Sequence, residues 1–299
     1  MTTTPAPATA PDGTRAGATD WVLLVLPGLI WGSSYLFIAE SLDAIRPEGI
    51  TFVRTLIGFS VLSFIPAVRR PIVPGDRRRV GLLGLVWLAF PMTMFPFAEQ
   101  RVSSALAGML NAATPLFTAI VTAAIIRRRP ANAVVTALAV GLAGAFLIAF
   151  PTIDEGRSSA IGVGMILAAL VSYGFALNLA GPLQQRNGAL PVIWRAVGCA
   201  VVLTAPTGIP ALLDSHWTWS SGLSMLALGG LGTGVANVIV ATAAGRGGAT
   251  RASAMGFIIP AVSLALGVGV RHEHVHTMSL VGGLVCVLGA WLLARAPRT

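Results

Sequence analysis

Charged side chains are scarce in this sequence. Of its 299 residues, 10% are Asp, Glu, Lys or Arg, whereas 55% are apolar. A soluble domain carries roughly 25% charged residues, because its surface must be solvated by water. The composition therefore excludes a soluble globular protein and indicates a protein that lies in a membrane.

Lysine is absent, and cysteine and histidine are rare. All 20 basic residues are arginines, and most lie at the ends of apolar runs. The net charge of +9 is therefore a topology signal, and no nucleic-acid partner is expected. Cys199 and Cys286 lie inside apolar runs and show neither a disulfide framework nor a metal-binding spacing. The alternating histidines of 272–276 do not resemble a catalytic zinc motif. We therefore expect no metal and no cofactor. Because no nucleophile and base converge within the apolar runs, we also expect no enzyme.

Long uncharged runs dominate the chain instead. Nearly all reach the ~20 residues that a helix needs to cross a bilayer, and they lack the alternation of a β-barrel strand. The predicted fold is all-α: a polytopic membrane protein of about ten transmembrane helices. We expect these helices at residues 21–38, 49–68, 80–97, 103–126, 131–150, 160–179, 190–209, 221–243, 249–270 and 279–293. Residues 1–20, rich in Thr, Ala and Pro, are expected to form a disordered cytoplasmic tail.

The distribution of arginine predicts the orientation. With a cytoplasmic N-terminus, fourteen arginines fall on the cytoplasmic side and four fall outside, namely Arg46, Arg101, Arg157 and Arg271. Positive residues concentrate on the cytoplasmic side of membrane proteins. We therefore predict cytoplasmic N- and C-termini in a multi-pass protein of the bacterial inner membrane.

An internal repeat divides the chain into two halves. Six residues of the first half recur 145 positions later, among them Arg101 as Arg246 and Pro115 as Pro260. Near the start of each half, Trp31-Gly32 precedes Arg54 as Tyr173-Gly174 precedes Arg195. We predict two five-helix repeats, at 21–151 and 158–295. An odd number of spans inverts the second repeat, as in many secondary transporters.

Several short motifs resemble one known family. Trp31-Gly32-Ser33-Ser34 with Arg54 in the next helix, the stretch Ser103 to Leu116, and Arg271-His272-Glu273 before a glycine-rich last helix resemble EamA-type transporters of the drug/metabolite transporter superfamily. The resemblance covers about residues 21–295. It implies a ten-helix bundle that exports amino acids, related metabolites or toxic compounds.

Two arginines lie within predicted spans. An arginine in a membrane helix costs at least ~2.5–3.5 kcal/mol, so it usually faces the bundle interior or a watery cavity. Arg54 and Arg195 are therefore candidates to bind a substrate carboxylate. Both lie near a helix end, and snorkelling or capping of carbonyls is the alternative.

Other polar, aromatic and helix-breaking residues complete the candidate substrate pathway. Pro115 and Pro260 are predicted to break the hydrogen-bond ladder at matching points, either to expose carbonyls to a substrate or to shape packing. The mid-helix amides are expected to line a cavity or to hold helices together. The candidates besides the arginines are Trp31, Ser33, Ser34, Tyr35, Asn111, Pro115, Tyr173, Asn178, Asn237, Phe257 and Pro260.

Proton coupling would need a titratable group that both sides can reach. No acidic residue sits mid-membrane, because Glu40, Glu99 and Glu273 lie at or beyond helix ends. Coupling through Glu99 and facilitated diffusion remain equally open.

We therefore predict a secondary transporter that exports a small polar or amphipathic metabolite by alternating access. A sensor or assembly subunit that does not transport is the alternative, with a membrane-embedded enzyme behind it. The expected partners are a small-molecule substrate and the lipid bilayer, and the oligomeric state stays open.

Overall fold

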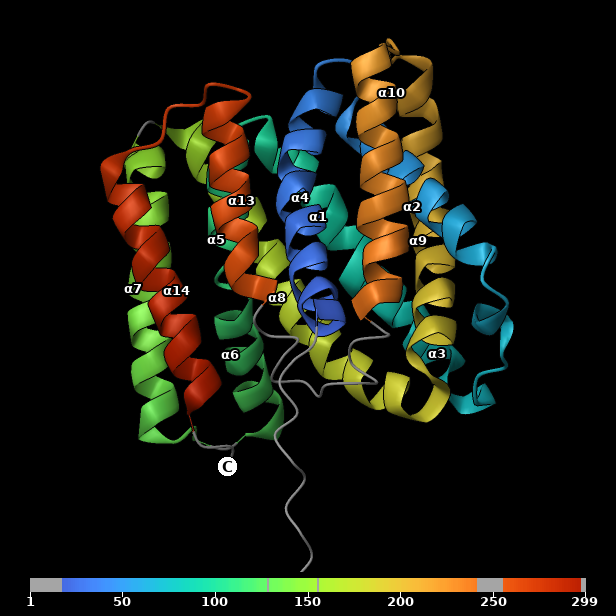
Figure 1. The fold of residues 1–299 in the computed structure, drawn as a ribbon, viewed down its shortest axis with the longest axis horizontal. Helices are drawn as coiled ribbons and strands as arrows, with labels where there is room; N and C mark the ends of the chain where they lie inside the picture. Colours follow the sequence, from blue (N-terminus) through green and yellow to red (C-terminus); the bar gives the residue numbers. More distant parts are fainter. Residues whose placement is uncertain (1–17, 128, 155, 241–254, 297–299) are drawn as a thin grey trace, which may run out of the picture.

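The protein is a bundle of helices, seen in a computed structural model that describes residues 18–127, 129–154, 156–240 and 255–296 (Figure 1). No β-strand occurs in these ranges, so the all-α prediction is confirmed. The first half contains α1 (Ala18–Leu42), α2 (Pro47–Ser63), η1 (Pro66–Arg69), η2 (Pro74–Asp76), α3 (Arg77–Leu83), η3 (Gly84–Ala89), α4 (Phe90–Glu99), α5 (Ser104–Asn111), α6 (Thr114–Ile126) and α7 (Asn132–Asp154). The second half contains α8 (Arg157–Asn187), α9 (Ala189–Leu213), α10 (Trp219–Leu226), η4 (Ala227–Val235), α13 (Met255–Gly269) and α14 (Thr277–Arg295).

Seven described helical segments are long and apolar enough to cross a membrane, and the bent pair α5–α6 makes an eighth. Two of the seven contain a π-helix: α3 continues through η3 into α4, and α10 continues through η4. The helix α2 has 17 residues and the described part of α13 has 15. A polytopic membrane protein is therefore shown, whereas the count of ten spans stays a prediction.

The two prolines predicted to break matching helices behave differently. The first half does break, because α5 ends at Asn111 and α6 begins at Thr114 with a bend of 44°. Pro115 lies in the first turn of α6, where a missing N–H costs no hydrogen bond. Pro260 instead lies inside the continuous helix α13. The described part of α13 is therefore helical through Pro260, although the proline removes one bond of its ladder.

Helix contacts recur in pairs across the two halves. The helix α1 packs on α13, and its counterpart α8 packs on α6; α2 packs on η4, and its counterpart α9 packs on η3. The two most extensive contacts join counterparts directly, α2 with α9 and α7 with α14. A two-fold relation between the halves would produce this exchange of partners.

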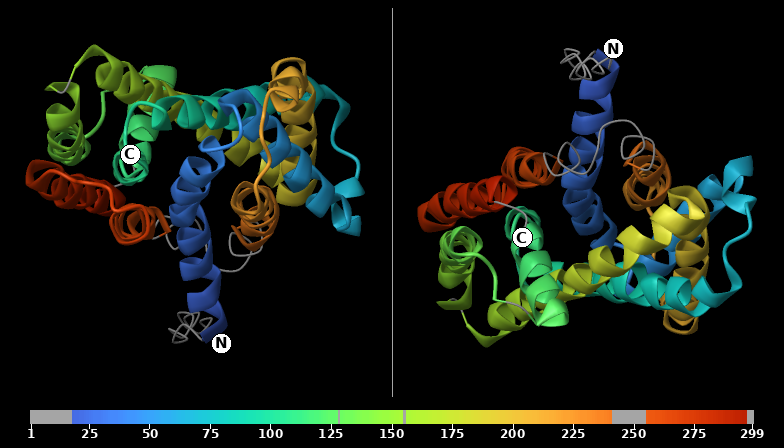
Figure 2. Two further views of the ribbon diagram at one scale, coloured as in Figure 1. Left: turned by 90° about the horizontal axis from the view of Figure 1, so that it is seen from above. Right: turned by 90° about the horizontal axis from the view of Figure 1, so that it is seen from below.

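Glycine allows the last helices of the two halves to approach closely. A Cβ on Gly282 of α14 would lie 2.6 Å from the backbone N of Ile148 in α7. A Cβ on Gly144 would collide with the backbone of Cys286 in the same way. Small residues let membrane helices pack backbone to backbone. Figure 2 shows the pair α7–α14 at one margin of the bundle, with α2 and α9 towards the other and α1, α4 and α8 between them.

Several connections lie at the end of the bundle opposite the start of α1 and the end of α14 (Figure 1). They include the α1–α2 turn, the α4–α5 turn, the α9–α10 loop and the α13–α14 loop. We call this end the distal end.

Candidate functional site

Arg54 lies inside the bundle, on α2, with 7% of its surface exposed. Its Nε donates a hydrogen bond to Thr233 Oγ1 at 3.0 Å. Among the described residues, its two terminal nitrogens have no hydrogen-bond acceptor. A buried guanidinium with open donors is suited to bind an anion.

The π-helix η4 packs against α1 and α2 beside Arg54. Trp31 Nε1 donates to the carbonyl oxygen of Gly232 at 2.9 Å, next to the residue that accepts from Arg54. A Cβ on Gly232 would lie 3.2 Å from Ser34 Oγ and 3.6 Å from Arg54 Nη2. We call Trp31, Ser34, Arg54, Gly232 and Thr233 the Arg54 site. Helices α1, α2 and η4 build it, and π-turns are frequent at functional sites.

Three aromatic rings continue the site towards α4 and α8. The ring of Tyr35 meets that of Phe95 edge-on at 5.5 Å between centroids, and Phe95 stacks on Tyr173 at 6.2 Å. Both tyrosines and Glu99 lie within electrostatic range of Arg54. The two predicted aromatics, Tyr35 and Tyr173, therefore lie near the predicted arginine. Phe95, between them, was not predicted, because nothing in a single sequence separates it from the other aromatics of the apolar runs.

Glu99 ends α4 at the distal end. Both of its carboxylate oxygens are buried, and neither has a hydrogen-bond partner among the described residues. It interacts electrostatically with Glu273, Arg54 and Arg271. A cavity of about 280 Å³ adjoins it, lined also by polar residues that include Arg101, Ser103, Thr152, His274, His276 and Ser279. Glu99 therefore lines a polar cavity, has buried carboxylate oxygens and lies within electrostatic range of Arg54.

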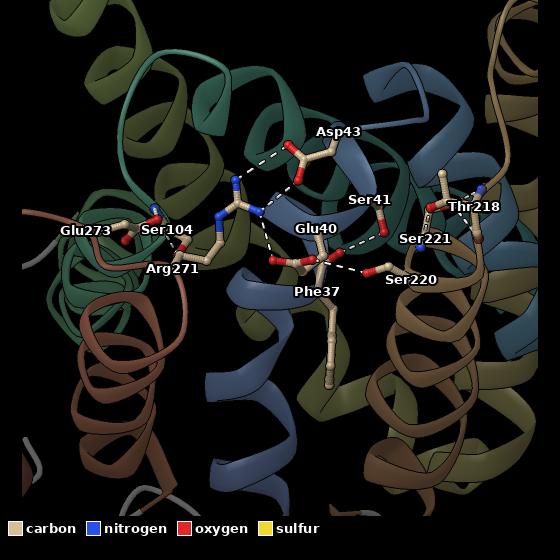
Figure 3. Close-up of polar contacts among 10 residues, drawn as sticks. All are labelled: Phe37, Glu40, Ser41, Asp43, Ser104, Thr218, Ser220, Ser221, Arg271 and Glu273. Atoms are coloured by element: carbon tan, nitrogen blue, oxygen red, sulfur yellow. Dashed lines mark hydrogen bonds and ion pairs between the residues drawn. The ribbon is translucent and has the colours of Figure 1, made fainter.

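Glu273, in the α13–α14 loop, accepts hydrogen bonds with both of its carboxylate oxygens. One carboxylate oxygen accepts from the backbone N of Ser104 at 3.0 Å and from its hydroxyl at 2.8 Å, and the other accepts from the backbone N of Ala105 at 2.8 Å (Figure 3). The α13–α14 loop thus caps the first turn of α5, where carboxylates are stabilising. The sequence placed Glu273 at a helix end but gave no sign of its partner.

Arg195, the counterpart of Arg54, lies elsewhere. Its Nη1 donates to the carbonyl oxygens of Val68 and Pro191, both at 3.1 Å, and its guanidinium lies 5.3 Å from the ring centroid of Trp194. At the offset of 145, Leu88 occupies the position that Thr233 has in the other half. The structure thus brings one of the two predicted arginines to the aromatic rings and gives the other backbone partners.

The three mid-helix amides make local or interhelical hydrogen bonds. Asn178 accepts from Thr122 of α6 at 2.9 Å, and Asn111 accepts from Thr114 at 3.0 Å across the α5–α6 break. Asn237 donates to the carbonyl oxygen of Thr233 at 2.7 Å, one turn beyond the Arg54 site. The first two therefore hold helices together, and Asn237 supports η4.

The remaining candidates are Ser33, Pro115, Pro260 and Phe257. Ser33 donates to the carbonyl oxygen of Ile30 at 3.0 Å, within its own helix. Pro115 is half-buried and Pro260 is buried. Phe257 belongs to α13, but its side chain lies outside what the structure describes. Within the described residues, no three of His, Cys, Asp and Glu are grouped so that they could hold a metal ion.

Comparison with known proteins identifies the family. The model of the EamA-like transporter family matches residues 21–150 and again residues 160–295. The chain is 25% identical over 277 residues to a "Probable terminal-alkyne amino-acid exporter" of Streptantibioticus cattleyicolor, covering 91% of this chain and 92% of that one. It is 26% identical over 266 residues to the "Uncharacterized transporter YdfC" of Bacillus subtilis, covering 87% and 86%.

One further relative and one solved structure agree with these matches. An "Uncharacterized transporter" of Archaeoglobus fulgidus is 22% identical over 284 residues, covering 92% of this chain and 98% of that one. A solved structure described as "Crystal structure of protein" shares the fold with a TM-score of 0.62 at 18% identity, covering 93% of this chain and 96% of that one. The chain therefore belongs to the EamA-like transporter family and is a multi-pass membrane protein with a transporter role.

Proposed function

We propose that the protein is a secondary transporter that exports a small polar or amphipathic metabolite bearing a carboxylate, such as an amino acid or a related compound. The observation that carries this proposal is the buried guanidinium of Arg54, whose terminal nitrogens have no acceptor among the described residues. The family match and the printed name of the relative from Streptantibioticus cattleyicolor support it.

The Arg54 site suits a carboxylate with an apolar or aromatic remainder. Arg54 offers two terminal nitrogens in a plane, and a planar fork of N–H donors matches the two oxygens of a carboxylate. Tyr35 and Tyr173 provide apolar ring surface and hydroxyl groups near this charge. A substrate amine would face Glu99, which lies within electrostatic range of Arg54.

Alternating access would use the two halves of the fold. Helices α1 and α8 each pack on the fourth helix of the other half, and π-helices interrupt the corresponding third helices as η3 and η4. Rocking of one half against the other would expose the Arg54 site first to one side of the membrane and then to the other.

The arginine count supports a proposed orientation in the bacterial inner membrane, with both termini in the cytoplasm and the distal end outside. Arg46, Arg101 and Arg271 belong to the distal connections, whereas Arg69, Arg70 and Arg77–Arg79 precede or begin α3 at the other end (Figure 1). Under this orientation Glu99 and its cavity lie near the external surface. Glu99 would then take up a proton from outside in exchange for the exported metabolite, and facilitated diffusion is the alternative.

Flux into proteoliposomes tests the transport proposal, with a panel of amino acids, carboxylates and organic cations. Arg54→Gln should reduce the flux of carboxylate-bearing solutes by at least tenfold and that of cations much less. Arg195→Gln is the matched control, because it removes the same charge from a residue bonded to backbone carbonyls. Equal losses for all solutes, or no solute crossing faster than in protein-free vesicles, would overturn the proposal and favour a sensor that does not transport.

A further inference from the structure

A three-residue ion cluster joins the two halves at the distal end. Arg271, in the α13–α14 loop, contacts Glu40 Oε1 with Nη1 at 2.8 Å and Asp43 Oδ2 with the same nitrogen at 2.9 Å (Figure 3). Its Nη2 reaches Asp43 Oδ1 at 3.5 Å. Glu40 and Asp43 belong to the end of α1 and the turn after it, so the cluster fastens the first half to the second.

This cluster is more sheltered than its neighbour at the same end. The side chains of Arg271 and Glu40 are 27% and 28% exposed and that of Asp43 is 62% exposed, whereas those of the pair Arg46–Asp214 are 55% and 64% exposed. Sheltered ion pairs are screened less by water and salt than exposed ones. The Arg271 cluster should therefore contribute more than the Arg46 pair to holding the halves together.

Both sides of the cluster are anchored to helix termini. Two residues after Arg271, Glu273 is bonded to the first turn of α5, which holds the loop in place. On the other side, Ser220 at the start of α10 donates to Glu40 Oε2 at 3.1 Å. Movement of α1 away from α13 at this end would therefore break the contacts of Arg271.

The opposite end lacks the corresponding residues. At the offsets of the repeat, Glu40 and Asp43 correspond to Pro182 and Gln185. Arg271 corresponds to Ile126. An inverted copy of the cluster would have neither the carboxylates nor the arginine. A different cluster joins the halves at that end, where the buried Asp76 contacts Arg186 at 3.2 Å and accepts from Asn187 at 2.8 Å.

We propose that Arg271, Glu40 and Asp43 form a latch that keeps the distal end closed while the site is loaded from the other side, and that the latch opens when the substrate is released. The proposal rests on the proposed transport cycle and orientation, under which the latch faces outward. Under that orientation the Arg271 cluster holds α1 to the α13–α14 loop until the substrate leaves on the outside.

Thiol labelling from outside tests the latch without requiring a known substrate. In a background with Cys199 and Cys286 replaced by alanine, Ser34→Cys reports access to the Arg54 site. A membrane-impermeant maleimide added to whole cells should label this cysteine slowly, and at least fivefold faster when Arg271→Gln or Asp43→Asn is added. The double exchange Asp43→Arg with Arg271→Asp should restore slow labelling. Arg46→Gln is the matched control and should leave the rate unchanged.

Equal labelling rates in Arg271→Gln, Asp43→Asn and Arg46→Gln would overturn the latch, provided that size-exclusion profiles show folded protein. A reversible thiol cross-linker between Asp43→Cys and Arg271→Cys gives a second test. Cross-linking should stop flux, and a reductant should restore it; unchanged flux in the cross-linked protein would also overturn the latch. A protein that transports nothing but shows the predicted labelling would contradict the proposed function and leave the latch standing.

Discussion

Arg54 and Thr233 are separated by 179 positions in the chain and are joined by a hydrogen bond of 3.0 Å from Nε to Oγ1. The bond orients the guanidinium through Nε and leaves the two terminal nitrogens for another acceptor. It also explains why Arg54 and Arg195 have different partners. The second half offers the hydroxyl of Thr233 to Arg54, whereas the first half has Leu88 at the matching position.

Thr233→Val should lower the affinity for a carboxylate-bearing substrate. Without this bond the guanidinium is no longer oriented towards the substrate, and a hydrogen bond to a charged group contributes about 1.5–3 kcal/mol, so the half-saturating concentration should rise about tenfold or more. Thr233→Ser keeps the hydroxyl and should remain close to the wild type. Concentration-dependent flux in proteoliposomes measures both. An unchanged half-saturating concentration in Thr233→Val would show that the bond does not position Arg54 for binding.

Gly232→Ala should narrow the Arg54 site. Its new methyl group would lie 3.2 Å from Ser34 Oγ, which is tighter than most real Cβ contacts, so bulky substrates should lose more flux than small ones. Gly230→Ala is the control within the same π-helix, because a Cβ there meets nothing within 4 Å. Flux relative to the wild type, measured for substrates of increasing size, distinguishes Gly232→Ala from Gly230→Ala. The same dependence on substrate size in both variants would contradict a site at Gly232.

Glu273→Ala should destabilise the fold. The change removes three hydrogen bonds to the first turn of α5, of which the two backbone N–H groups lose a charged acceptor at about 1–3 kcal/mol each. Ser104→Ala removes the hydroxyl bond alone and should cost less. Thermal unfolding in detergent compares the unfolding midpoints of the two variants. An unchanged midpoint for Glu273→Ala would rule out the cap.

Glu99→Gln should abolish the dependence of flux on a pH gradient while flux down the substrate gradient persists. The amide cannot exchange a proton, but it fits the same space. Asp214→Asn is the control, because it neutralises an exposed acid of the same end. Flux measured with and without an imposed pH gradient checks the prediction. A gradient response that survives in Glu99→Gln would place the coupling elsewhere.

The stabilisation that Arg271 contributes should not change between about pH 7 and pH 9. Hydrogen bonds to Asp43 and then Glu40 raise the pKa of Arg271 above its ordinary value of 12.5. A group with a raised pKa contributes fully below its unfolded pKa and loses that contribution only as the pH rises through the folded pKa. The difference in unfolding midpoint between wild type and Arg271→Gln should therefore be the same at both pH values. A difference that shrinks towards pH 9 would contradict the assignment.

The membrane class and the all-helical fold could be predicted from composition and from the length of the apolar runs. The candidates Trp31, Ser34, Tyr35, Arg54 and Tyr173 were also found from the sequence, because charge, polarity and aromatic rings stand out in an apolar helix. Their grouping in space was not predictable, since it depends on which faces of five helices meet.

Three features needed the structure. Arg54 is held inside the bundle by the hydroxyl of Thr233, which is 179 positions away in the sequence. The sequence did offer one sign of this difference between the halves, because Leu88 occupies the position that matches Thr233. Glu99 and Glu273 look alike in sequence, and only packing shows that one is without a described partner and the other has three. The described part of α13 is helical on both sides of Pro260, so the bend seen beside Pro115 has no counterpart there.

The helix α1 is continuous from Ala18 to Leu42, and it carries both Ser34 beside the buried guanidinium and Glu40 beside Arg271. Six residues of α-helix span roughly 9 Å, a distance over which such a rod scarcely bends. A tilt of the distal end of α1 would therefore also displace Ser34 in the Arg54 site. Opening of the proposed latch and weakening of substrate binding would then occur together.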